Sequence, residues 1–137
     1  MDNFSIFAHG GQLDADELLH AIPLRFDIVW RRGDRISSCV GGHYETSGVE
    51  IILGCGETLP IREQERVAEA FITANRDALH ALARHPNVDC CVLGLQYHVS
   101  FKPKGRRKFC VCPSLRLLRL ADDVGIRSVV YGTVDHE

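Results

Sequence analysis

Two cysteines in the stretch FCVCPS, Cys110 and Cys112, have the spacing that comes closest to a metal site in this sequence. A turn centred on Gly105 would place His98 opposite Cys112, so these three side chains would share one face of a sheet. Alternate residues of a strand stand ~6.6 Å apart, whereas two sulfurs on one zinc ion stand only ~3.8 Å apart. The spacing therefore favours buried, hydrophobic cysteines, and we expect neither a metal nor another cofactor.

A third cysteine, Cys55, lies between two glycines in the stretch GCGET, where a strand would turn into a helix. Backbone amides at such a turn can activate a thiol as a nucleophile. However, no histidine is near it in sequence, and glycines at such a junction are typical of turns. The run His43, Tyr44 and Glu45 contains acid and base groups, but three consecutive polar residues are more typical of a solvated loop. The sequence therefore predicts no catalytic residue.

Two charged segments are candidates for binding a partner. The turn KPKGRRK carries five cations and no acid, a pattern that suits phosphates or an acidic protein surface. It has no interleaved aromatic residues on which bases could stack, which argues against nucleic acid. An acidic pair near the C-terminus would instead face a basic partner. The candidate partner-binding residues are Lys102, Lys104, Arg106, Arg107, Lys108, Asp122 and Asp123.

The composition is that of an ordinary globular protein. The chain has 137 residues, 45% hydrophobic and 25% charged, with a net charge of −2. This length suits a single domain over residues 1–137, and the small net charge gives no general attraction to nucleic acid or anionic membranes. No apolar run has the ~20 residues of a membrane helix, and the start MDNFSIFAHGG does not resemble a signal peptide. We expect a cytoplasmic protein whose cysteines are reduced.

Hydrophobic periodicity predicts the elements that position these residues. Phe4, Ile6 and Ala8 alternate as in a strand, and Asp14 followed by Glu17 is typical of a helix start. Gly125 would end the last helix. The predicted helices span about 14–22, 60–84 and 113–124. The predicted strands span about 3–8, 24–30, 49–53, 88–101, 109–112 and 127–134, the fifth returning from the fourth in a hairpin.

These elements predict an α+β fold in a single domain. We expect a mainly antiparallel sheet of roughly four to six strands, with about three helices packed mostly on one face. The apolar stripes of the helices and the long fourth strand should form one core. Its predicted members are Phe71, Leu79, Leu82, Cys91, Leu95, Tyr97, Val99, Leu118 and Ala121.

Several motifs together resemble a known family. They are FSIFAHGGQLDADEL from Phe4, then Pro23, WRRGD from Trp30, and FCVCPSLRLLRLADDVGI from Phe109, followed by the VVY of a last strand. From Phe4 to Tyr131 the chain is similar to the uncharacterised bacterial family called domain of unknown function four-two-seven-nine. It differs from that family in lacking a tryptophan near SGVEIIL and in the placement of Gly125. The resemblance implies a small α+β domain without known catalytic residues, of a kind often found as immunity proteins beside polymorphic toxins.

Three functional hypotheses follow. The absence of a catalytic constellation favours a protein-binding domain, most concretely an immunity protein that neutralises a cognate bacterial toxin by direct binding. An alternative is a small enzyme or ligand-binding domain that uses Cys55, or the face of His98, Cys110 and Cys112. A third is an RNA-binding protein that uses the KPKGRRK turn. The sequence leaves open which surface binds the partner and whether the protein is a monomer or a dimer.

Overall fold

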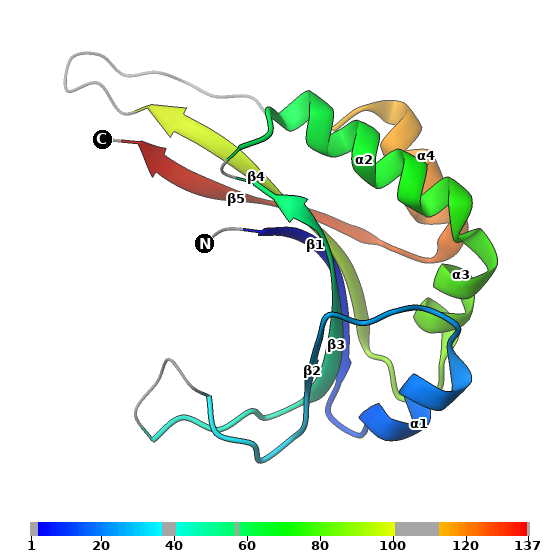
Figure 1. Cartoon of the computed structure of the whole chain (residues 1–137). Helices are drawn as coiled ribbons and strands as arrows, with labels where there is room; N and C mark the ends of the chain where they lie inside the picture. The colour runs from blue at the N-terminus through cyan, green and yellow to red at the C-terminus, as the bar shows by residue number, and fades with distance from the viewer. Residues whose placement is uncertain (1–2, 37–40, 57, 101–112, 137) are drawn as a thin grey trace.

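The computed structural model describes residues 3–36, 41–56, 58–100 and 113–136. In this part of the chain, five strands form one sheet, and four helices lie on one of its faces (Figure 1). The strands are β1 (Asn3–Gly10), β2 (Ile28–Trp30), β3 (Ser47–Cys55), β4 (Cys90–Ser100) and β5 (Ser128–His136). The helices are α1 (Ala15–Ala21), α2 (Ile61–Ala74), α3 (Arg76–Arg84) and α4 (Leu115–Val124).

The strands lie in the order β2-β3-β1-β4-β5. Neighbours run antiparallel except for β4 and β5, which are parallel. Parallel neighbours need a crossover, and here the chain returns through α4. The predicted α+β fold, with a mainly antiparallel sheet and helices on one face, is confirmed. The predicted strand at 109–112 and the turn before it lie outside the described residues.

The structure divides one predicted helix in two. Residues predicted as a single helix over 60–84 form α2 and α3, which meet at Asn75 with a backbone φ of −125° and ψ of 29°. The Asn75 side chain donates from Nδ2 to the Phe71 carbonyl oxygen at 2.9 Å. A side-chain bond of this kind competes with the regular helical bonds and favours a break. No helix in the described ranges has the length and apolar character needed to cross a membrane.

The core lies between the sheet and the helices. Phe4, Ile6 and Ala8 of β1 point into it at alternate positions and are fully buried. Five predicted core residues are buried, and two more are half-buried, of which Phe71 packs against the core. The buried ones are Leu79, Leu82, Cys91, Leu95 and Ala121, and the half-buried ones are Phe71 and Tyr97. The side chain of Val99 is outside the described part of the structure.

The predicted burial of Leu118 is wrong, because this side chain is 39% exposed. The buried stripe of α4 consists of Leu117, Ala121 and Val124, which are spaced by four and three residues. Leu118 lies about 100° further around the helix than Leu117, since an α-helix has about 3.6 residues per turn. It therefore points past the core toward β5.

A buried glutamine continues the hydrogen bonding of the sheet where a strand pairing ends. The pairing of β1 with β4 stops at Ser5 and Gly94, so it does not reach the peptide groups of Gln96. The fully buried Gln64 of α2 bonds to them instead. Its Oε1 accepts from the Gln96 N–H at 2.8 Å, and its Nε2 donates to the Gln96 carbonyl oxygen at 2.8 Å. The amide thus replaces a peptide unit of a neighbouring strand.

Hydrogen bonds tie the start of α4 to α2. Ser114 caps α4, because its Oγ accepts from the Leu117 N–H at 3.0 Å. The same hydroxyl donates to Glu69 Oε1 at 2.8 Å, and the Ser114 N–H donates to Glu65 Oε2 at 3.2 Å. Glu65 is almost fully buried and also accepts from Arg62. These bonds fix the position of the helix that precedes β5.

Candidate functional site

One face of the sheet, the one turned away from the helices, is left open by the described part of the chain (Figure 1). Residues paired across strands share a face, and successive residues alternate between faces. Because Ile6 points to the helices, Phe7 and its partners point to the opposite side. We call this side the open face. Its described residues include Ser5, Phe7, His9, Ile28, Trp30, Gly48, Glu50, Ile52, Cys90, Val92, Gly94, Gln96, Ser128, Val130 and Gly132.

Apolar side chains around a glycine form the centre of the open face. A Cβ at Gly94 would lie 3.7 Å from the Phe7 ring and 3.8 Å from the Val130 side chain. Glycine therefore leaves a shallow floor between these two side chains. Val130 is 46% exposed, and Ile28 at the β2 side is 43% exposed. Between these two edge strands, the Phe7 side chain is half-buried and the Val92 side chain is buried. An apolar patch on a face that no described element covers is typical of a surface that binds another molecule.

Trp30 lies flat against the β2 side of the open face. A Cβ at Gly48 would collide with the Trp30 ring, so only glycine allows this close approach of the ring to the sheet. The Trp30 ring centroid is 6.0 Å from that of Tyr44, and its Nε1 lies 3.5 Å from Thr46 Oγ1. The indole is therefore held between the sheet and the chain that leads into β3.

Polar groups on the open face are paired with each other. The Ser5 hydroxyl donates to Glu50 Oε1 at 3.0 Å. The rings of Phe7 and His9 stack, with centroids 6.3 Å apart and planes inclined by 14°. The face thus combines an apolar centre with satisfied polar groups, and its only ionised side chain among the described residues is the Glu50 carboxylate.

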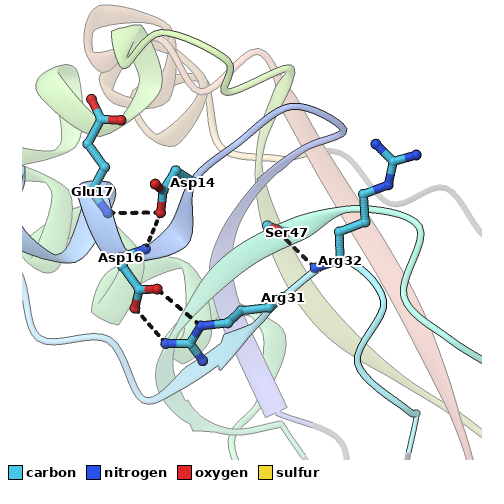
Figure 2. A network of polar contacts seen from close by, with 6 residues as sticks. All are labelled: Asp14, Asp16, Glu17, Arg31, Arg32 and Ser47. Carbon is cyan, nitrogen blue, oxygen red and sulfur yellow. Dashed lines mark hydrogen bonds and ion pairs between the residues drawn. The ribbon is translucent and has the colours of Figure 1, made fainter.

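A polar network anchors the β2 edge of the open face to α1 (Figure 2). Arg31 Nη2 lies 2.7 Å from Asp16 Oδ1. This hydrogen bond and the opposite charges lower the pKa of Asp16 and raise the pKa of Arg31. The Arg32 N–H donates to Ser47 Oγ at 2.9 Å, and Arg32 Nη1 donates to the Gly11 carbonyl oxygen at 3.2 Å. Because β2 has only three residues, these bonds help to hold it in place.

The predicted acidic pair lies on α4, which packs on the other face of the sheet. Asp122 and Asp123 border a cavity of about 430 Å³ that Arg84 and Arg127 also line. Asp123 pairs with Arg76 at 3.3 Å. Arg76 therefore balances the charge of Asp123, whereas Asp122 forms no ion pair with the described residues. The predicted basic residues Lys102, Lys104, Arg106, Arg107 and Lys108 lie outside the described residues.

The described cysteines do not form a reactive cluster. Cys91 is buried, and burial, followed by the charge of neighbouring Cys90, raises the pKa of its thiol to about 12. Cys55 is half-buried at the end of β3, and its described hydrogen bonds are those of its carbonyl oxygen with Thr58. No group of three metal ligands occurs among the described residues. Cys110, Cys112 and the His98 side chain lie outside them.

The run from His43 to Glu45 serves the structure of a loop. His43 Nδ1 lies 3.1 Å from the Gly33 carbonyl oxygen, and the His43 side chain is exposed. Tyr44 packs beside Trp30, and its backbone bonds to Asp34 and Gly33. These contacts explain why polar residues stand here, and they leave the solvated-loop interpretation as the one that the geometry supports.

Sequence reasoning missed the open face. Phe7, Ile28 and Val130 belong neither to the predicted core nor to the predicted binding residues. The signal was present in β1, where Phe7 lies between the core residues Ile6 and Ala8. An apolar residue therefore occupies a position on the side of the strand that faces away from the core. A similar signal is present in β3, where Ile51 and Ile52 are consecutive and so point to opposite faces.

In comparisons with known proteins, the chain matches no protein-family model, no curated protein and no solved structure. The resemblance to the domain of unknown function named above therefore stays a prediction.

Proposed function

We propose that this chain is a cytoplasmic protein-binding domain, most concretely an immunity protein, and that its open face covers a cognate bacterial toxin. The observation that carries this proposal is the apolar centre of that face, with Phe7 and Val130 around Gly94 and no described element above them. An apolar centre with polar groups around it is the usual anatomy of a protein interface.

The charge of the open face favours a protein partner over a nucleic acid. Neither lysine nor arginine occurs among its described residues, and its ionised group is the Glu50 carboxylate. A carboxylate repels phosphates, whereas nucleic-acid binding needs cations. We therefore expect the bound surface of the partner to be apolar, with a basic group opposite Glu50.

Co-expression with the toxin encoded by a neighbouring reading frame tests this function. The wild-type protein should restore growth of cells that produce the toxin. Ile28→Asp should weaken binding at least ~10-fold and abolish protection, because it replaces an exposed apolar side chain of the open face by a second carboxylate beside Glu50. Growth and the affinity of the purified pair are the two measurements.

Leu19→Asp is the matched control for Ile28→Asp. Leu19 is 37% exposed, close to the 43% of Ile28, but it belongs to α1 on the other side of the sheet. This variant should protect cells like the wild type. If neither variant changes protection, the open face is not the binding surface. If no neighbouring toxin is neutralised by the wild type, the immunity function itself is wrong.

A further inference from the structure

The edge strand β5 offers a backbone surface for pairing. In the described sheet its only neighbour is β4, so its outer edge is not paired with another described strand. The strand spans nine residues and contains neither proline nor lysine, the residues that commonly protect a sheet edge from association. An unprotected edge of this length is a template for an additional strand.

An apolar groove runs between this edge and α4. Leu118, Ile126 and Val129 line it, and its volume is about 670 Å³. Leu118 is 39% exposed, and Leu115, one turn earlier on α4, is 61% exposed. Leu118 therefore lies beside an edge that no described strand pairs with, and one partner could cover both.

The charges of α4 run in the order opposite to the one that its own dipole favours. Cations stabilise a helix near its C-terminus and anions near its N-terminus, but here the arginines precede the aspartates. Arg116 and Asp123 find partners in Glu69 and Arg76. Arg119 and Asp122 are exposed and have no ion-pair partner among the described residues. A second α4 in antiparallel orientation would place each of them against the opposite charge.

We propose that the occupant of this surface is a second copy of the chain, in a symmetric dimer. A two-fold axis would pair β5 with β5 of the other copy in antiparallel orientation. Because β4 and β5 are parallel, α4 runs back against β5, so the same axis also makes the two α4 helices antiparallel. Arg119 of each copy then pairs with Asp122 of the other, and the exposed Leu118 of each copy lies beside these pairs. This inference is independent of the proposed function.

Charge reversal tests the pairing by sedimentation equilibrium of the whole chain, from micromolar to near-millimolar concentration. The wild type should sediment with twice the mass of one chain. Arg119→Asp and Asp122→Arg should each weaken the dimer at least ~10-fold, since each places like charges together twice. An equimolar mixture of the two variants should recover a dimer, because a heterodimer restores both opposite-charge pairs. Leu19→Asp should dimerise like the wild type.

Each other outcome overturns the proposal. A wild-type protein that is monomeric throughout this range has no such dimer. A dimer that resists both reversals uses a different surface. If the single variants are monomeric and their equimolar mixture is monomeric too, Arg119 and Asp122 do not pair across the axis. Circular dichroism of each variant distinguishes these results from a loss of folding, which is not expected because both side chains are exposed.

Discussion

Gln64 is the residue on which the sheet depends most beyond the end of the β1–β4 pairing. Besides the two bonds to Gln96, its Nε2 donates to the Leu59 carbonyl oxygen at 2.8 Å. Gln64→Leu keeps the volume but leaves the Gln96 N–H and carbonyl groups without these partners. We expect the free energy of unfolding to fall by about 2 to 6 kcal/mol, since each of the two buried unsatisfied groups costs roughly 1 to 3 kcal/mol. Urea denaturation measures this change.

Gln12→Leu is the control for this prediction. Gln12 is exposed in the connection between β1 and α1, so its replacement should change the free energy of unfolding by no more than about 0.5 kcal/mol. Equal effects of the two substitutions would show that the Gln64 amide does not support β4.

Cys91 makes the stability of the fold depend on alkaline pH. Burial raises the pKa of its thiol to about 12 in the folded state. Its contribution to stability is therefore complete below the unfolded pKa, near pH 9, and is lost as the pH rises toward the folded pKa. Over that interval the stability advantage of the wild type over Cys91→Ala should shrink by about 1.4 kcal/mol per pH unit. Urea denaturation of both proteins across this range measures it, and a pH-independent difference would contradict the prediction.

The hydrogen bonds that join the start of α4 to α2 should contribute measurably to the stability of the protein. Ser114→Ala removes the N-cap of α4 together with the bond to Glu69. We expect a loss of about 1 to 2 kcal/mol in the free energy of unfolding. Thr73→Ala, which removes an exposed hydroxyl that bonds only within α2, should cost no more than about 0.5 kcal/mol. Thermal or urea unfolding measures the free energy of unfolding of both variants. If Ser114→Ala costs no more than Thr73→Ala, the cap of α4 is dispensable.

The ends of two helices could be predicted, because the signal for each is a single residue at the end itself. Asp14 was expected to start a helix, and its Oδ1 accepts from the Asp16 and Glu17 N–H groups at 3.0 and 3.2 Å. Gly125 was expected to end one, and it adopts the left-handed conformation with φ of 90°. Each signal depends on one side chain or one dihedral angle, so the sequence alone contains it.

Features that depend on distant contacts could not be predicted. The helical pattern of apolar residues continues on both sides of Asn75, so periodicity alone predicts one uninterrupted helix instead of α2 and α3. The parallel pairing of β4 with β5 depends on where α4 packs. The open face could not be recognised either, because a strand pattern does not say which of two apolar faces the helices cover. The open face could therefore be recognised only in the structure, whereas the charged candidate residues could be named from the sequence.

The two proposed surfaces are compatible within one molecule. The open face and the helices lie on opposite sides of the sheet (Figure 1), and the dimer contact uses α4 and the β5 edge. A two-fold axis that brings the α4 helices together keeps both open faces on the same side of a continuous sheet. The dimer would therefore present two binding faces to two toxin molecules, side by side.

This arrangement predicts the composition of the toxin complex. The wild-type complex should contain two copies of each protein, whereas the monomeric variant Arg119→Asp should bind one toxin and still protect cells, because the open face is unchanged. Ile28→Asp should show the reverse behaviour, remaining a dimer without protecting. The mass of each purified complex and the growth of co-expressing cells measure these outcomes. If folded Arg119→Asp fails to protect, then the toxin contacts the β5–α4 surface, and the two functions do not reside on separate faces of the sheet.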